Sequence, residues 1–298
     1  ATIERINRPG ELYQIDETPF DVVLVANRFS ITGLCVGSPT LYLVYDVHSN
    51  LVVGIHLTLN PPSWEGMRQA LLNAFLPKVE FCQRYGININ EEDWPYGVPD
   101  ELLGDNAELR AEMSELLEQQ FNCSVRFTRS RRGDDKGLVE GGFPAFHRAL
   151  KGRLPGVQHS KQNDKGLTES RFRAILTIDD LYKILINLAL FRNKNIELSY
   201  DKLDRDMRKD DVIPKPLALW RWGCRERGGP KTYSRDYIES RLKSKGTATI
   251  KKEGVKFKDL WYNCDWTLQN GLQDRKPAGN KSPKVVCLYD KNTTDTIT

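Results

Sequence analysis

The sequence predicts a mixed α/β domain followed by a small all-β domain, and three observations support this. In the first 200 residues, short β-prone runs alternate with segments whose apolar residues recur every three or four positions. The apolar pattern then gives way to a charged segment, 201–211, and to Pro214 and Pro216. After these prolines, three short β-prone runs lie close together.

Strands open the α/β domain. The expected strands are 11–16, 20–26, 41–46, 51–59, 101–105 and 123–128. The third and fourth are apolar at successive positions and are separated by His48-Ser49-Asn50, which favours a turn. They predict a hairpin in a sheet that is covered on both faces.

The expected helices cover 63–86, 107–120, 139–150 and 177–192. Ser63 is a good N-cap, and Glu65 lies in the first turn, where the helix dipole favours an acid. Pro77 should kink or split this helix, because proline has no backbone N–H to donate. Thr177 and Asp180 have the spacing of a capping box.

Beyond the prolines, we expect strands at 247–251, 255–262 and 284–289, with a tight turn at 252–254. So small an all-β domain is expected to close into a barrel, because open edges invite aggregation. We expect its core to contain the tryptophans Trp220, Trp222, Trp261 and Trp266, the alternative being platforms on which bases stack. The predicted organisation is a lead-in (1–10), an α/β domain (11–200), a linker (201–213), a basic β-barrel domain (214–290) and a flexible tail (291–298).

Positive charge is concentrated in two parts of the chain. The whole sequence carries +4, but residues 212–298 carry +9 and residues 126–173 carry +7. Two separate basic blocks indicate a polyanionic partner, the alternative being an ordinary solvated surface.

Composition argues against zinc and against a membrane. Six cysteines are scattered without a Cys-x-x-Cys pair, and only four histidines are present. We therefore expect reduced thiols in a cytoplasmic protein. No apolar run reaches the ~18 residues of a membrane helix, and no signal-peptide pattern begins at Ala1.

Three acidic residues fall at the ends of predicted elements. Asp16 and Asp105 each end a strand, and Glu140 begins a helix directly after a loop rich in Arg and Lys. Carboxylates gathered at one edge of a sheet repel one another unless a cation compensates, and oxygen ligands suit Mg²⁺ or Mn²⁺. The alternative is three unrelated surface acids. We interpret Asp46 as a turn-side carboxylate, and Asp134-Asp135 as a solvated part of the loop.

These residues carry a family resemblance. Ile15-Asp16-Glu17-Thr18, Gly104-Asp105-Asn106-Ala107 and Lys136-Gly137-Leu138-Val139-Glu140 resemble the core motifs of DDE transposases of the retroviral integrase and phage Mu transposase superfamily. The intervals of 89 and 35 residues fit the family's Asp, Asp-(about 35)-Glu pattern. The run 246–262 resembles the β-barrel that follows this core in the phage Mu group, and within that group the chain is most similar to the TnsB type.

The resemblance implies an RNase H-like core, with Asp16, Asp105 and Glu140 holding two Mg²⁺ ions that Mn²⁺ can replace. It implies cleavage of transposon 3′ ends, their joining to target DNA, and an oligomer on DNA in the bacterial cytoplasm and nucleoid. The implied protein partners are an endonuclease, TnsA, and an ATPase regulator, TnsC. The expected DNA contacts are Arg129, Arg131, Arg132, Lys136, Arg148 and Lys151 around Glu140, and Lys243, Lys245, Lys251, Lys252 and Lys256 in the β domain.

Two departures from the pattern qualify these expectations. Gly141, Gly142 and Pro144 follow the glutamate where a regular helix prefers other residues. The upstream helical domains with which such transposases recognise transposon ends are not in this chain. Two other functions stay open: a purely hydrolytic RNase H-like nuclease, such as a resolvase, and a non-catalytic DNA-binding scaffold.

Overall fold

The computed structural model describes residues 6–27, 34–104, 110–127, 154–156, 171–269, 271, 282–289 and 297–298. Asp105, Glu140, the basic residues from Arg129 to Lys151 and the helix expected over 139–150 lie outside these ranges. The chain divides into two compact units, Ala1–Ser234 and Arg235–Thr298. In the part that is described, no helix combines the length and the apolar character needed to cross a bilayer.

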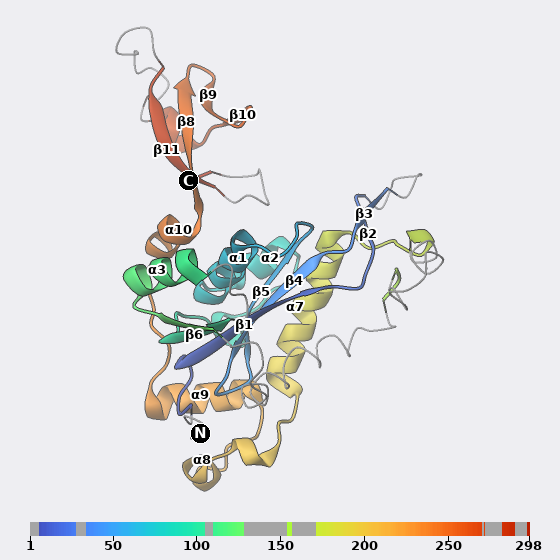
Figure 1. Ribbon diagram of the computed structural model, residues 1–298, viewed down its shortest axis with the longest axis vertical. Helices are drawn as coiled ribbons and strands as arrows, with labels where there is room; N and C mark the ends of the chain where they lie inside the picture. The colour runs from blue at the N-terminus through green and yellow to red at the C-terminus, as the bar shows by residue number, and fades with distance from the viewer. Residues whose placement is uncertain are drawn as a thin grey trace. The chain divides into compact units, whose positions relative to one another are not determined.

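Five strands form the main sheet of the first unit, in the order β5-β4-β1-β6-β7 (Figure 1). They are β1 (Leu12–Pro19), β4 (Thr40–Asp46), β5 (Val52–Thr58), β6 (Glu101–Gly104) and β7 (Ser124–Phe127). β4 pairs antiparallel with β1 and β5, whereas β6 pairs in parallel with β1 and β7. A three-stranded antiparallel part continued by two parallel strands is the RNase H-like order, which confirms the predicted fold class.

Shorter strands and helices complete this unit. They are β2 (Leu24–Val25), β3 (Cys35–Gly37), α1 (Trp64–Phe75), α2 (Val79–Arg84), η1 (Glu91–Asp93), α3 (Arg110–Phe121), α7 (Ile178–Asn195), η3 (Tyr200–Lys202), α8 (Arg205–Lys209) and α9 (Pro216–Arg227). The expected strand 20–26 is reduced to two residues in β2, which pairs only with the short β3.

Helix α1 covers one face of the β4–β5 hairpin. A Cβ added to Gly66 would lie 2.4 Å from the Tyr42 ring, and one added to Gly54 would lie 2.7 Å from the Cβ of Ala74. Only glycine permits this close approach of helix and sheet. Ser63 caps α1 by accepting a hydrogen bond from Gly66 N, and the helix ends before Pro77, as predicted.

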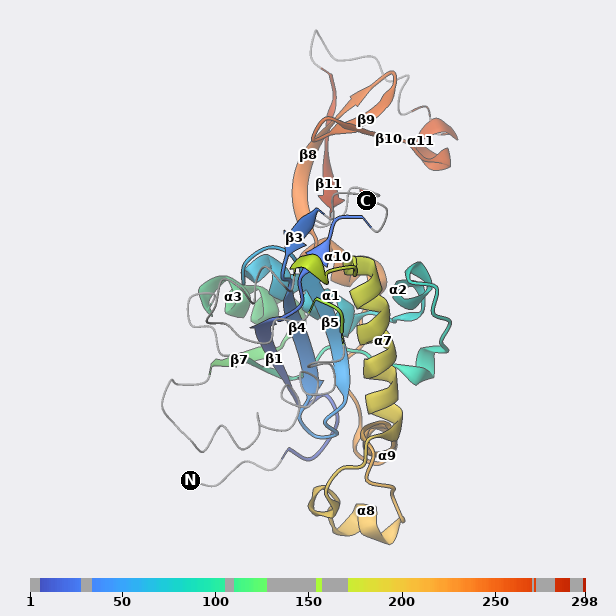
Figure 2. The ribbon, with the colours of Figure 1, turned by 90° about the vertical axis from the view of Figure 1, so that its right-hand side faces the viewer.

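Helix α7 covers the opposite face of the hairpin and runs along the strands (Figure 2). Its buried side chains Leu181, Leu185 and Ala189 pack into the same core as Leu41 and Leu43 of β4. The predicted capping box is confirmed, since Thr177 and Asp180 bond reciprocally through their side chains and backbone N–H groups. The hairpin of apolar strands is therefore buried on both faces, as the sequence predicts.

The C-terminal part of the first unit differs from the expected organisation. The segment predicted as a linker forms η3 and α8, and α9 lies within the predicted β domain, yet all three belong to the first unit. Trp220 and Trp222 of α9 are buried there, and the Trp220 ring lies 6.4 Å from that of Tyr13 on β1. Their assignment to a barrel core is wrong.

After α9, residues 230–231 pack against the segments that precede β1 and β6. Val98 and Lys231 pair through two backbone hydrogen bonds of 2.8 and 2.9 Å. Pro230 lies so close to Gly10 and Gly97 that a Cβ on either glycine would come within 2.6 Å of it. These contacts explain why α9 belongs to the first unit although prolines precede it.

The second unit contains a four-stranded antiparallel sheet in the order β10-β9-β8-β11. Its elements are α10 (Arg235–Leu242), β8 (Ser244–Lys251), β9 (Gly254–Phe257), β10 (Leu260–Tyr262), α11 (Asp265–Gln269) and β11 (Lys284–Tyr289). The run expected as one strand over 255–262 is a hairpin, because Lys258 and Asp259 form its turn with φ of 45° and 63°. Within the described ranges, no pairing joins β10 to β11 to close a barrel.

Candidate active site

Asp16 lies near the end of the central strand β1. It is directly opposite Leu43 of β4, and residues paired across strands point to the same face of a sheet. Leu43 packs in the core beneath α7, so Asp16 belongs to the face that α7 covers. Its side chain is half-buried, and its Oδ1 atom accepts a hydrogen bond of 2.9 Å from the N–H of Glu17.

The end of β6 lies beside β1 at the same level. Ile15 pairs with Gly104 in the parallel register, and Asp16 and Asp105 are the next residues in the two segments. The predicted end of β6 is confirmed up to Gly104, but the prediction that β1 ends at Asp16 is wrong, because β1 continues to Pro19 through its pairing with β4. The positions of Asp105 and Glu140 stay predictions.

Tyr45 and Arg192 lie on the same side of the sheet as Asp16. The Arg192 guanidinium is 5.9 Å from the centre of the Tyr45 ring, and the Arg192 side chain is almost fully buried. Burial raises the pKa of Tyr45; Arg192 opposes this shift, whereas the charge of Asp16 adds to it. The Nε atom of Arg192 has no hydrogen-bond partner among the described residues.

Arg192 is not among the site residues predicted from the sequence. The signal was present, because Leu185, Ala189 and Arg192 lie at intervals of four and three along the buried stripe of α7. The Arg192 guanidinium therefore brings a fixed positive charge to the face of the sheet that carries Asp16. On the same face, the charge of Asp16 raises the pKa of Tyr45.

Asp46 is a structural carboxylate, as predicted. It is fully buried at the start of the β4–β5 turn, where one oxygen accepts from Gly10 N at 2.9 Å. The other accepts from Ser49 N at 2.8 Å and Ser49 Oγ at 2.5 Å. Burial raises the pKa of Asp46 to about 6 despite these bonds. With its oxygens committed to the turn, Asp46 is a poor candidate for a metal ligand.

Asp16 suits a hard cation, being a half-exposed carboxylate on the central strand. Among the residues that the structure describes, no three His, Cys, Asp or Glu side chains form a metal-binding group. Two of the three expected ligands lie outside those residues, so the three-carboxylate centre stays a prediction.

The described basic residues differ in their surroundings. Lys245, Lys251 and Lys252 are exposed. Lys243 lies 2.5 Å from a carboxylate oxygen of Glu239, and Lys256 lies 2.9 Å from Asp259. The expected contacts around Glu140 lie outside the described ranges.

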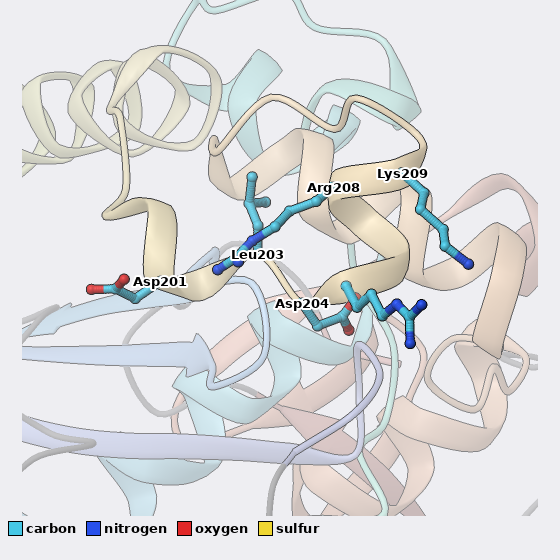
Figure 3. A pocket seen from close by; sticks show the side chains of 6 residues that line it. Asp201, Leu203, Asp204, Arg208 and Lys209 are labelled. Atoms are coloured by element: carbon cyan, nitrogen blue, oxygen red, sulfur yellow. The ribbon is translucent and has the colours of Figure 1, made fainter.

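A separate hollow of about 440 Å³ lies at η3 and α8. Its lining consists of Asp201, Leu203, Asp204, Arg205, Arg208 and Lys209. In Figure 3, the Arg208 side chain lies beside Leu203, and that of Lys209 points away. Asp204 also caps α8 and pairs with Arg227 at 2.6 Å, so one of the two acids is already neutralised. No residue of β1 or β6 lines this hollow.

Comparison with known proteins shows what the chain is similar to. A family model described as the TnsB C-terminal domain matches residues 14–156. The transposition protein TnsB of transposon Tn7 from Escherichia coli is 33% identical over 293 residues, which cover 97% of this chain. The chain is similar to TnsB over nearly all of its length. The segment matched by the family model contains Asp16, Asp105 and Glu140, so all three expected acids lie within the matched region.

A second relative is less similar. The transposase of transposon Tn552 from Staphylococcus aureus is 20% identical over 56% of the chain. The chain spans 41% of the Tn7 protein and 32% of the Tn552 protein, less than half the length of either.

Among solved structures, a simian T-cell lymphotropic virus intasome in complex with the PP2A regulatory subunit B56 gamma matches 87% of this chain and 67% of its own, with 14% identity and a TM-score of 0.40. The catalytic core domain of BIV integrase matches 63% of this chain and 87% of its own, with 14% identity and a TM-score of 0.30. The fold assignment rests on the strand order itself.

Proposed function

We propose that this chain is the catalytic part of a TnsB-type DNA transposase that cleaves the 3′ ends of a transposon and joins them to target DNA. The observation that carries the proposal is the parallel pairing of Ile15 with Gly104, which places the end of β6, the strand that leads into Asp105, directly beside Asp16 of β1. A strand end beside a neighbouring strand is where an RNase H-like sheet can bring two carboxylates together. TnsB and the Tn552 transposase, the relatives named above, are both transposition proteins.

In this proposal, Asp16, Asp105 and Glu140 hold two Mg²⁺ ions, which Mn²⁺ can replace. Paired ions supply activation of the attacking oxygen and stabilisation of the leaving oxygen in an in-line displacement. Asp16 is suited to a fixed ligand because β1 is the central strand, hydrogen-bonded on both sides. A ligand on such a strand is positioned more tightly than one on a loop.

The chemistry consists of two successive phosphoryl transfers. Water first attacks the phosphodiester bond at the transposon end and frees a 3′-hydroxyl group. That hydroxyl group then attacks a phosphodiester bond of the target DNA. Neither transfer needs a covalent protein–DNA intermediate, so no Ser or Tyr nucleophile is assigned. Arg129, Arg131, Arg132, Lys136, Arg148 and Lys151 are proposed to hold the phosphates near the reacting bond.

A TnsA-type endonuclease, a TnsC-type ATPase regulator and an oligomer on DNA belong to the same proposal. They follow from the relationship to TnsB, of which the chain spans 41%.

The decisive experiment is a strand-transfer assay with a labelled transposon-end duplex, target DNA and Mg²⁺. A precut end with a free 3′-hydroxyl is included, so that joining is measured even when end cleavage needs upstream domains. We expect cleaved and joined products that disappear in EDTA and in Asp105→Asn, but persist in Asp21→Asn, which removes an acid outside the proposed site. Cleavage without joining of the precut end would indicate the hydrolytic nuclease, and metal-independent binding alone the scaffold.

A further inference from the structure

The four-stranded sheet of the second unit has two chemically different faces. Side chains alternate between the faces along each strand. One face carries the buried residues Ala248, Val255, Phe257 and Cys287, which form the core of the unit. The residues between them, on the other face, are therefore directed away from this core.

A continuous row crosses the face that is directed outward. Trp261 of β10 pairs with Lys256 of β9, Lys256 pairs with Thr249 of β8, and Thr249 pairs with Lys284 of β11. Directly paired residues share a face, so an indole, a hydroxyl and two ammonium groups lie in line across the whole sheet. With about 4.8 Å between strands, the row spans roughly 14 Å.

More positive charge lies beside this row. Lys245 and Lys251 lie at the two ends of the outward face of β8, on either side of Thr247 and Thr249, and both lysines are exposed. No acidic residue occurs within β8, β9, β10 or β11; Glu253 and Asp259 lie in the two hairpin turns, and Asp290 follows β11 in the sequence. The face thus combines four lysines, Lys245, Lys251, Lys256 and Lys284, with one aromatic ring, and one of the four, Lys256, already lies 2.9 Å from Asp259.

Trp261 and Trp266 are exposed, so their assignment to a barrel core is wrong. The exposed fraction of Trp261 is 46%, in contrast to the buried Trp220 and Trp222 of the first unit. The Lys256 ammonium lies 6.0 Å from the centre of the indole, within the range of a cation–π contact. An exposed indole beside lysines can stack on a flat aromatic group, while the lysines contact negative charges next to that group.

We propose that this face, defined by Lys245, Thr249, Lys251, Lys256, Trp261 and Lys284, binds an unpaired DNA strand. The Trp261 ring stacks on a base, and the lysines contact the phosphates on either side. A duplex cannot use the indole in this way, because its bases already stack on one another; it can use only the lysines. Aromatic stacking combined with lysine–phosphate contacts is the general means of binding single strands without reading sequence.

This binding mode rests on the DNA binding of the proposed function, but not on its catalysis. It extends that function from a duplex substrate to strands that have lost their pairing, such as the flanks of a cut or joined end. An acidic peptide would also be attracted to the lysines, but it offers no base to stack on Trp261.

The test measures binding of the full chain to three fluorescent 12-nucleotide probes in EDTA, by fluorescence anisotropy. The probes are oligothymidylate, the same strand with abasic sites, and a duplex. We expect Trp261→Leu to weaken binding of oligothymidylate about tenfold, as loss of one stacked base predicts, and to change duplex binding less than twofold. Abasic sites should weaken binding to the unaltered chain by the same factor and have no further effect on Trp261→Leu.

Three variants serve as controls. Trp261→Tyr keeps a stacking ring and should retain most of the affinity for the single strand. Trp266→Leu removes a tryptophan of α11 that is 62% exposed and not on the sheet, and should change nothing. Lys284 lies on the edge strand β11. Lys284→Gln should weaken the binding of oligothymidylate and of the duplex, and this variant can be tested even if Trp261→Leu fails to fold.

The possible failures have different meanings. If the unaltered chain binds the duplex but not oligothymidylate, or if abasic sites leave its affinity unchanged, the inference is overturned and the proposed transposase stands. If neither DNA is bound, the DNA-binding half of the proposed function fails with it. If a fluorescent acidic peptide binds but no oligonucleotide does, the face is a protein-docking surface instead.

Discussion

Ile15 of β1 and Gly104 of β6 are partners in a parallel register, and in the sequence each is followed at once by an aspartate. The pairing places the end of β6 level with Ile15, whereas β1 continues past Asp16 to Pro19. Asp16 lies on the face that α7 covers, opposite Leu43. A carboxylate within the central strand, next to the strand end that leads into another aspartate, is the arrangement on which the proposed two-aspartate metal site rests.

Substitution of Asp16 should separate binding from catalysis. We expect Asp16→Asn to lower cleavage and strand transfer at least a thousandfold, because the amide lacks the charge that holds a divalent cation. DNA affinity measured in EDTA should stay within twofold of the unaltered chain. Asp16→Cys should be equally inactive in Mg²⁺ but partly active in Mn²⁺, which accepts a sulfur ligand more readily than Mg²⁺ does.

Asp21→Cys is the matched control, since it puts a thiol at an acid five residues further along the chain. It should leave activity in both metals unchanged. If Asp16→Cys behaved identically in Mg²⁺ and Mn²⁺ while Asp105→Cys was rescued, Asp16 would act on the site without being a ligand.

How far the sequence predicts this fold depends on how local the signals are. The cap at Ser63, the helix break at Pro77 and the capping box at Thr177 each depend on a few neighbouring residues, and all three were predicted. The turn at Lys258–Asp259 was missed, because neither residue is the glycine or asparagine that usually marks positive φ. Once the hairpin is known, Trp261 falls on the outward face, and its exposure follows.

Helix α9 was missed for a different reason. Pro216 was interpreted as a boundary, whereas in the structure it occupies the first turn of the helix, where proline is favoured. That α9 belongs to the first unit depends on the distant contacts of Pro230 and Lys231 with Gly97 and Val98. Likewise, the sequence singles out Asp16, but only the tertiary packing of α7 brings Arg192 to the same face.

The pH dependence of stability should contain two opposing contributions near pH 5. Burial lowers the pKa of His56 to about 4 and raises that of Asp46 to about 6. The unfolded chain therefore binds more protons at His56 between about pH 4 and 6.5, so the stabilising contribution of neutral His56 is lost as pH falls through this window. At Asp46 the folded chain binds more protons between about pH 3.8 and 6, so stability is lost as pH rises.

Each contribution amounts to roughly 3 kcal/mol, so they largely cancel in the unaltered chain. Denaturant titrations from pH 4 to 7 should reveal them in single variants. The free energy of unfolding of His56→Gln, relative to the unaltered chain, should increase as pH falls from 6.5 to 4. That of Asp46→Asn should decrease over the same interval. Parallel curves for all three proteins would show that neither side chain is buried in the charge state inferred here.

Lys78 should destabilise the fold at neutral pH. It is 1% exposed, donates from Nζ to the carbonyl oxygens of Leu76 and Pro95 at 3.1 and 3.3 Å, and has a pKa lowered to about 7 by burial. The unfolded chain binds more protons between pH 7 and the normal lysine pKa, so stability rises with pH in that window. Between pH 7 and 9 we expect a gain of roughly 2 kcal/mol that is absent in Lys78→Met.

Lys183→Met, at an exposed position of α7, should follow the unaltered chain over the same range. The measurement is the free energy of unfolding in urea at pH 7 and 9. Equal gains in Lys78→Met and the unaltered chain would assign the rise to other groups.

The salt dependence of duplex binding should distinguish lysines that lie on the same small unit. Lys251 is exposed at the end of β8, whereas the Lys243 ammonium lies 2.5 Å from the Glu239 carboxylate. A lysine that neutralises a phosphate releases a counterion, and each such contact contributes about 0.9 to the slope of log affinity against log salt. We expect Lys251→Gln to make this slope shallower by about 0.9. Lys243→Gln should leave it unchanged, because Glu239 of α10 already compensates the charge of Lys243.

The measurement is an anisotropy titration of a labelled duplex in EDTA, at KCl concentrations from about 50 to 300 mM. An equal loss of slope in both variants would mean that Lys243 leaves Glu239 when DNA binds, and no loss in either would place the duplex on another surface of the chain.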